Sequence, residues 1–154
     1  RDGWKQLADQ GAQLVVWSAA YDGGNLLNAY AALHMYYVVS TVRTNHARII
    51  DLTGRTIAQG ARWNGLAMAT VDLETTLFHI DRQFQKIDQI RRALGDKVTI
   101  RAHSEENVFT IESNDAQWPM ERIQKEFSLM TYKDYHAEAS RLQEDWRAKY
   151  PRKR

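Results

Sequence analysis

The chain has 154 residues, a formal net charge of +2 and no cysteine. This length suffices for a domain with a real core, and the composition is that of an ordinary globular protein. The lack of cysteine excludes disulfides, thiolate metal sites and cysteine nucleophiles within these residues. No apolar run is long enough to span a bilayer and no signal-peptide pattern opens the chain, so no membrane partner is predicted. The compartment stays open, with the cytoplasm as the default.

The first half of the chain predicts alternating short helices and strands. Residues 1–10 form a helix that no N-cap residue precedes and that ends at Gly11. The apolar run 14–17 predicts a buried strand, and Asn25 caps a second helix that leads directly into a strand over 37–42.

Two further strand signals follow. Residues 47–59 predict a hairpin that turns at Gly54, because β-branched runs flank a glycine. Residues 66–73 alternate between apolar and polar side chains, which predicts another strand.

The second half predicts helices around two more strands. Apolar spacing over 84–94 indicates a helix that stops at Gly95, and strands are predicted at 98–100 and 108–111. Pro119 fits the first turn of a helix whose apolar residues continue to Met130, and a final helix carries a stripe from Tyr135 to Trp146. The fold class is therefore α/β, with antiparallel parts in the sheet.

Four pieces of the sequence, in order, carry a resemblance. They are GAQLVVWSAAY at 11–21, YAALHMYYVV at 30–39, IIDLTGRTIA at 49–58 and ATVDLE at 69–74. No single piece is specific, but their order over roughly half the chain is hard to obtain by chance. The chain resembles the nitrilase, or carbon–nitrogen hydrolase, superfamily. Trp17 stands where that family has proline and His34 where it has asparagine, and the loop 43–48 is shorter than in many members.

The resemblance implies an αββα sandwich. Residues 1–113 would be roughly the C-terminal half of the hydrolase domain, and residues 114–154 a helical C-terminal extension. The family cleaves non-peptide C–N bonds of amides, nitriles or carbamoyl groups with a Cys nucleophile, a Glu base and a Lys, without a cofactor. These three residues would precede Arg1, so no catalytic residue is expected in this chain, which alone is predicted to be inactive.

The same resemblance assigns a substrate-binding loop to Ser18, Ala19, Ala20 and Tyr21. Small residues leave room there, Ser18 and the backbone offer polar contacts, and Tyr21 offers a wall. The alternative is structural: Ser18 caps a turn and Tyr21 simply packs.

Other polar residues have plainer interpretations. The stretch from His103 to Asn107 lies between two predicted strands and favours a solvated turn over a metal site, so no metal is predicted. His34 fits a hydrogen-bonded core histidine better than a general base. Surface charge explains the scattered carboxylates Asp81, Asp88, Glu105, Glu106 and Glu112.

The exposed strand edges, the terminal helices and the basic C-terminal residues bear on the partners of the chain. A half-sandwich would expose strand edges and an apolar face. The aromatic-rich terminal helices either pack on their own sheet or on a second subunit in a homo-oligomer, with Trp118, Met120, Phe127, Trp146 and Tyr150 as the residues concerned. The basic end 149–154 is expected to be solvated, and no basic stripe elsewhere supports nucleic-acid binding. A non-catalytic binding or oligomerisation module is the alternative function.

Overall fold

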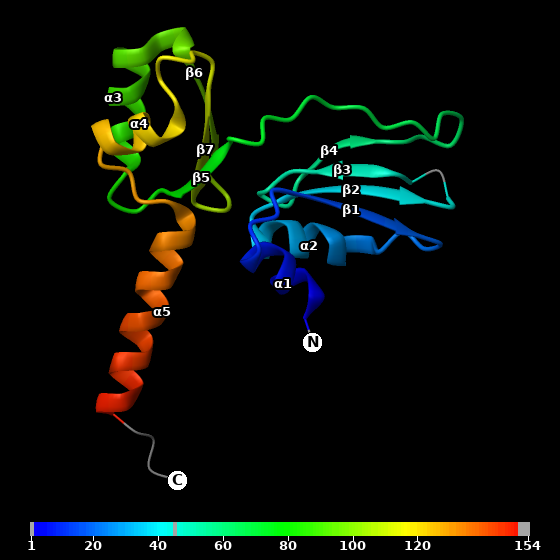
Figure 1. Cartoon of the computed structure of the whole chain (residues 1–154), viewed down its shortest axis with the longest axis horizontal. Coiled ribbons are helices and arrows are strands. Elements are labelled where there is room, and N and C mark those ends of the chain that lie inside the picture. Colours follow the sequence, from blue (N-terminus) through cyan, green and yellow to red (C-terminus); the bar gives the residue numbers. More distant parts are fainter. Residues whose placement is uncertain (1, 45, 151–154) are drawn as a thin grey trace. The chain divides into compact units, whose positions relative to one another are not determined.

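The computed structural model describes residues 2–44 and 46–150 (Figure 1). Arg1 of the predicted first helix, Asn45 of the short loop and the last four residues of the basic end lie outside the described residues. The chain is a mixed α/β protein with two small open sheets, of four and three strands. It divides into two compact units, Arg1–Leu73 and Glu74–Arg154. The division after residue 113 that the resemblance implies stays a prediction.

The unit Arg1–Leu73 contains one four-stranded sheet with helices on one face (Figure 1). The strand order is β1-β2-β3-β4, with β1 and β2 parallel and the other pairs antiparallel. This confirms the predicted strand–helix–strand segment and the hairpin. The elements are α1 (Gly3–Asp9), β1 (Leu14–Ala19), α2 (Gly24–His34), β2 (Tyr37–Val42), β3 (Arg48–Ile50) and β4 (Thr56–Gln59).

The hairpin turn shows why Gly54 is needed. Its φ is +84°, a conformation that side chains with a Cβ rarely adopt, and a Cβ there would lie 2.8 Å from the Asn28 carbonyl oxygen. The Gly54 N–H also donates to the Asp51 carbonyl at 2.9 Å. The turn therefore packs its backbone directly against α2.

Both predicted helix starts in this unit were wrong. Helix α1 begins at Gly3, and Asp2 is its N-cap, because its side chain accepts from the Lys5 N–H at 3.2 Å. Helix α2 begins at Gly24 rather than after an Asn25 cap. Gly23, at φ +69°, turns the chain into the helix two residues earlier, without a side-chain cap.

The strand predicted over 66–73 was also wrong. Within the described residues this segment has no strand partner, and Leu66 and Met68 are 63% and 77% exposed. Alternating side chains suit any extended backbone, and only a ladder of hydrogen bonds makes that backbone a strand. The end of the segment is tied to the sheet, since Gln13 Nε2 donates to the Leu73 carbonyl at 2.8 Å.

The core of this unit lies between the sheet and α1 and α2. Buried side chains come from β1, α2, β2 and β3, and residues of α1 pack against them; the buried set is Val15, Leu27, Ala31, Tyr36, Val38 and Ile50. The register pairs Val16 with Val39, and Val39 with Ile49, so these three side chains share the opposite face. Val16 is 65% exposed there.

The unit Glu74–Arg154 contains a three-stranded antiparallel sheet in the order β5-β7-β6. The predicted helix over 84–94, both predicted strands and the final helix are confirmed. The elements are β5 (Thr76–His79), α3 (Phe84–Leu94), the 3₁₀ turn η1 (Gly95–Lys97), β6 (Val98–His103), β7 (Val108–Ser113), α4 (Met120–Glu126) and α5 (Tyr132–Lys149).

The helix predicted to continue to Met130 is shorter. It ends at Glu126, and Pro119 precedes it as its N-cap. Ser128 has a φ of +51°, so the chain turns sharply before α5 begins. This break lets the Leu129 side chain reach the core, where it is buried.

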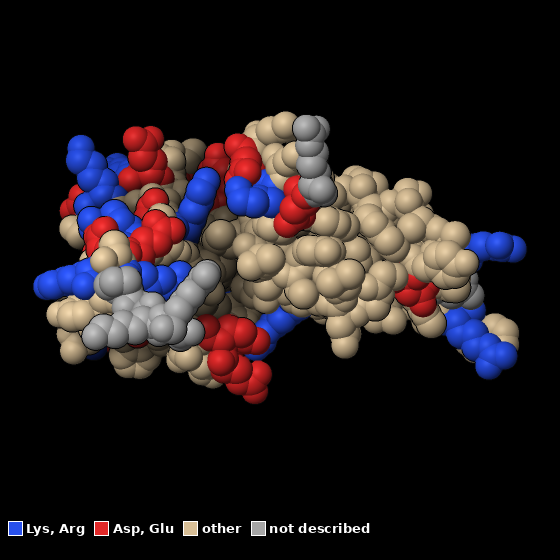
Figure 2. Space-filling view, turned by 90° about the horizontal axis from the view of Figure 1, so that it is seen from below, with Lys and Arg blue, Asp and Glu red and all other residues tan. Residues whose placement is uncertain are grey.

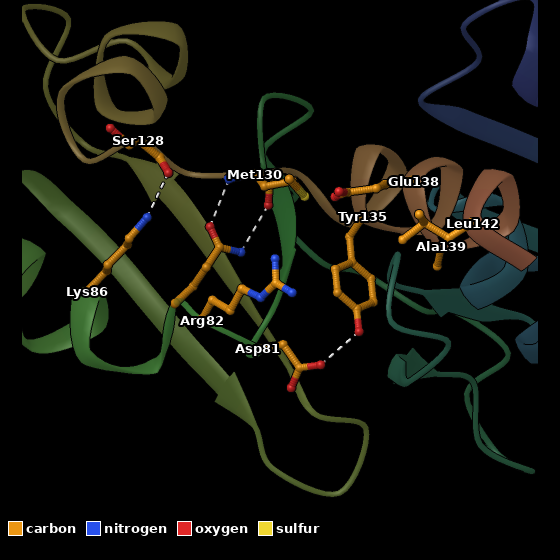
Figure 3. Close-up of a pocket in the computed structure, with 10 residues that line it drawn as sticks. Asp81, Arg82, Lys86, Ser128, Met130, Tyr135, Glu138, Ala139 and Leu142 are labelled. Atoms are coloured by element: carbon orange, nitrogen blue, oxygen red, sulfur yellow. Dashed lines mark hydrogen bonds between the residues drawn. The ribbon is translucent and has the colours of Figure 1, made fainter.

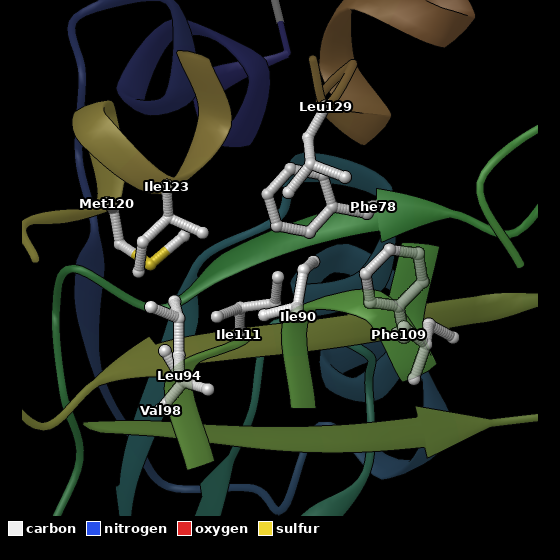
Figure 4. Close-up of a cluster of buried hydrophobic side chains, with 10 residues drawn as sticks. Phe78, Ile90, Leu94, Val98, Phe109, Ile111, Met120, Ile123 and Leu129 are labelled. Carbon is white, nitrogen blue, oxygen red and sulfur yellow. The ribbon is translucent and has the colours of Figure 1, made fainter. Parts of the chain in front are cut away.

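The core of this unit lies where α3 and α4 cover one face of the sheet (Figure 4). The rings of Phe78 and Phe109 stack at 5.2 Å, and Ile123 of α4 is fully buried above them. Among the residues predicted to form the apolar surface of the terminal helices, Met120 is buried, and Trp118 and Phe127 pack against the same core. Trp146 of α5 and Tyr150, which caps the end of this helix, are by contrast 67% and 54% exposed.

Candidate functional site

The predicted substrate-binding residues lie where β1 ends. Ser18 and Ala19 are the last residues of the strand, which continues two residues beyond the predicted end because it pairs with β2 along its whole length. Ser18 pairs with Thr41 on the open face of the sheet, and Ala19 points to the other face. Ala20 and Tyr21 follow, and Tyr21 is 83% exposed. The four residues stay predicted as a substrate loop.

The loop that follows is held by a carboxylate. Asp22 accepts a hydrogen bond from the Thr44 hydroxyl, and its Oδ2 lies 2.8 Å from His46 Nδ1. Both partners come from the loop after β2, so Asp22 ties together the loops at the ends of the two parallel strands. The hydrogen bond from Thr44, followed by that from His46, lowers the pKa of Asp22.

Arg48, the first residue of β3, binds the backbone of the same loop. Its guanidinium donates to the carbonyls of Asp22 at 3.0 Å and Gly24 at 2.8 Å, and to Asn28 Oδ1 at 3.0 Å. Asn28 in turn donates to the carbonyl of Gly54 at 2.8 Å. One chain of hydrogen bonds thus joins the loop, α2 and the hairpin.

Sequence reasoning missed these positioning residues. Two signals were available: Asn28 interrupts the apolar pattern of a helix, and Arg48 opens a strand whose other members are apolar. A polar residue at such a position needs a partner inside the fold. Which partner it finds depends on the packing of α2 on the sheet.

The site lies at the carboxyl ends of adjacent parallel strands, which is where ligands bind in many α/β sheets. It offers the Ser18 hydroxyl and an imidazole oriented by Asp22. No described group of three or more His, Asp or Glu side chains is arranged to hold a metal ion. None of the described helices combines the length and the hydropathy that a membrane crossing requires.

Two of the other histidines, His34 and His103, lie outside this site. His34 lies between the rings of Tyr30 and Tyr36, at 6.1 and 5.6 Å. Its buried Nε2 has no hydrogen-bond partner among the described residues, so the expectation of a hydrogen-bonded histidine is not met at that atom. His103 ends β6, and residues 104–107 form the predicted turn.

A cavity of about 770 Å³ follows the outer edge of β1. In the described sheet this edge has no neighbouring strand. The cavity is lined from α1, β1 and α2 by Asp2, Gly3, Trp4, Leu7, Val15, Val16, Trp17 and Tyr30. Apolar side chains and an unpaired strand edge therefore occur together.

No family model and no curated protein matches this chain. The resemblance to carbon–nitrogen hydrolases therefore rests on the four sequence pieces and stays a prediction.

Proposed function

We propose that this chain is part of a carbon–nitrogen hydrolase that acts on amide, nitrile or carbamoyl substrates. In this proposal the Cys, Glu and Lys of the reaction lie upstream of Arg1. The chain supplies the loop Ser18–Tyr21 beside the nucleophile and part of an αββα sandwich. By itself it does not hydrolyse the substrate.

The observation that carries the proposal is a hydrogen-bond network formed by residues that adjoin three of the resembling pieces. The loop after β1, helix α2 and the hairpin are joined through Arg48 and Asn28. Asn28 stands just before the second piece and Arg48 just before the third, so the pieces lie in one local arrangement. The network also holds the backbone directly after the predicted substrate loop, at Asp22 and Gly24.

The surface of the unit Arg1–Leu73 gives further support. It carries six Lys or Arg and five Asp or Glu, against fifteen and fourteen in Glu74–Arg154. The face of the molecule in Figure 2 shows the same contrast, because charged side chains are dense at one end and sparse over the rest. Few charges, an apolar sheet face and a free strand edge together suit a unit that is covered by further sheet.

A non-catalytic binding or oligomerisation module is the second candidate. One observation favours it: α5 has no buried residue, and Leu142 and Trp146 on its apolar stripe are 54% and 67% exposed. Such a stripe suits a partner helix. This candidate predicts self-association without any need for a catalytic residue.

The test uses the complete open reading frame that contains this chain. Ammonia release from short aliphatic amides and nitriles is expected from the full-length protein and not from residues 1–154. Ser18→Trp in the full-length protein fills the proposed substrate loop and is expected to abolish turnover. Leu33→Trp adds the same kind of bulk at an exposed position of α2 and should leave turnover unchanged.

Three results contradict the proposal. They are ammonia release by the isolated chain, a reading frame without an upstream Cys, and equal activity of the Ser18 variant and the wild type. A start codon directly before Arg1, together with a stable dimer in analytical ultracentrifugation, supports the second candidate instead.

A further inference from the structure

A separate cavity of about 330 Å³ lies within the unit Glu74–Arg154 (Figure 3). Three segments line it: the turn from β5 into α3, the link between α4 and α5, and one face of α5. Its volume is at the lower end of the range of small-molecule pockets, roughly 300–1,000 Å³. It lies outside the unit that carries the proposed substrate loop.

Two side chains hold the first two segments together. Gln83, which is buried, donates to the carbonyls of His79 at 2.9 Å and Met130 at 3.0 Å, and accepts from the Met130 N–H at 2.8 Å. Lys86 Nζ donates to the Ser128 carbonyl at 2.7 Å (Figure 3). These bonds fix the backbone on one side of the cavity.

Helix α5 forms the opposite wall. Its lining residues are Tyr135, Glu138, Ala139 and Leu142, whose spacing places them on one helix face. The Tyr135 hydroxyl donates to Asp81 Oδ2 at 2.7 Å, and its ring stacks on His79 at 4.1 Å. The wall is thereby anchored at its N-terminal end.

Opposite charges face the cavity from opposite walls. Arg82 and Lys86 lie on the β5–α3 side, and Glu138 lies on α5. Among the described residues, the side chains of Arg82 and Glu138 have neither a hydrogen bond nor an ion pair. Arg82 also has a φ of +60°, which is unusual for a residue with a Cβ and costs backbone energy.

The charges of the lining residues cancel, since Asp81 and Glu138 balance Arg82 and Lys86. An anion alone would be attracted to one wall and repelled by the other, and the same holds for a cation. Apolar surface from Met130, Ala139 and Leu142 lies beside the charged groups. The lining therefore suits a small molecule that carries both charges and an apolar body.

We infer that this cavity binds a free α-amino acid with an aliphatic side chain. Its carboxylate pairs with the Arg82 guanidinium, which presents a fork of donors, and with Lys86. Its ammonium group pairs with Glu138. Its side chain lies against Met130 and Leu142, both of which are partly exposed without a ligand.

The first experiment compares three probes on the whole chain by NMR titration of the backbone amides of Met130 and Ala139. The probes are L-leucine, 4-methylpentanoate, which lacks the ammonium group, and 3-methylbutylamine, which lacks the carboxylate. Each charged hydrogen bond contributes roughly tenfold or more to affinity, so leucine is expected to bind at least about tenfold more tightly than either analogue. Equal affinities, or no shifts with leucine, overturn the inference.

The second experiment tests the two walls. Arg82→Gln and Glu138→Gln are each expected to weaken leucine binding by roughly tenfold. Arg92→Gln removes an exposed charge from α3 outside the cavity and should leave the affinity unchanged. Thermal melts of all three variants check folding. The inference fails if both cavity variants bind leucine as the wild type does, or if Arg92→Gln weakens binding as much.

Discussion

The unit Glu74–Arg154 packs α3 and α4 on one face of its sheet, whereas Arg1–Leu73 packs helices on one face and leaves Val16 on the other 65% exposed. In the former, the opposite face of the sheet carries charged and polar pairs: Arg101 pairs with Glu112, and Asn114 donates to Thr99 Oγ1 at 3.0 Å. Leu77 and Val108 are buried on the same face. In the latter, the opposite face carries Val16, Val39 and Ile49. Charged pairs on a sheet face suit solvent, whereas exposed apolar side chains such as Val16 suit a further cover.

The difference in the density of charged side chains also indicates that part of Arg1–Leu73 is covered by a further layer. Charged side chains are about twice as dense in Glu74–Arg154 as in Arg1–Leu73. Solvent-facing positions tolerate charge, and positions that another layer covers do not. The unit with the incomplete cover is also the unit that carries the proposed hydrolase loop.

The largest expected effect is in the complete core. Phe109→Ala removes a fully buried ring that stacks on Phe78, and is expected to lower the free energy of unfolding by about 3–5 kcal/mol. Phe84→Ala removes a ring that is 66% exposed and should cost about 0.5 kcal/mol or less. Urea denaturation of both variants measures the contrast, and similar losses would contradict the assignment of the core.

The two faces of the four-stranded sheet give the next effect. Ile50→Ala on the helix-covered face is expected to cost about 2–5 kcal/mol, because Ile50 is fully buried. Val16→Ala on the opposite face should cost about 0.5 kcal/mol or less in this chain. A large loss from Val16→Ala would show that this face is already covered, which would remove a support of the proposed function.

A smaller effect is expected from Gln83, whose side chain holds the link between α4 and α5 beside the cavity. Gln83→Ala leaves the N–H and carbonyl of Met130 without the buried Gln83 side chain as their partner and is expected to cost about 1–3 kcal/mol. Hydrogen exchange at the Met130 amide should accelerate accordingly. The neighbouring exposed Gln85, replaced by Ala, is the matched control. Unchanged exchange in Gln83→Ala would mean that the Gln83 side chain does not hold the segment between α4 and α5.

The smallest expected effect is the contribution of Asp22 to the pH dependence of stability. The folded pKa of Asp22 lies below the usual aspartate value of 3.8, mainly because Thr44 and then His46 donate to its carboxylate. A lowered pKa stabilises the fold above the unfolded pKa, and this contribution is lost as the pH falls through the folded pKa. A ¹³C NMR titration should give a midpoint below 3.8 that rises in Thr44→Ala. A Thr44→Ala midpoint equal to that of the wild type would contradict the stated cause.

Local patterns sufficed for most elements of the fold. The spacing over 84–94 and the glycine at 54 determine a helix and a turn without help from distant residues, because backbone preferences and side-chain periodicity act within a few positions. The sequence was less informative where a paired strand and an unpaired extended segment share the same alternating pattern. Residues 66–73 alternate like a strand, yet the strand of this region begins at Thr76, where β7 supplies a partner.

The sequence by itself determined the α/β class, the hairpin, the main helices and the position of the predicted loop at the end of β1. Only the tertiary structure decided that Asp22, Arg48 and Asn28 hold that loop, and that Arg82 and Glu138 face one cavity. These groups are up to 56 positions apart in the sequence. Hydrogen bonds and charges act over a few ångströms, so contacts of this kind exist only after the sheets and helices have packed.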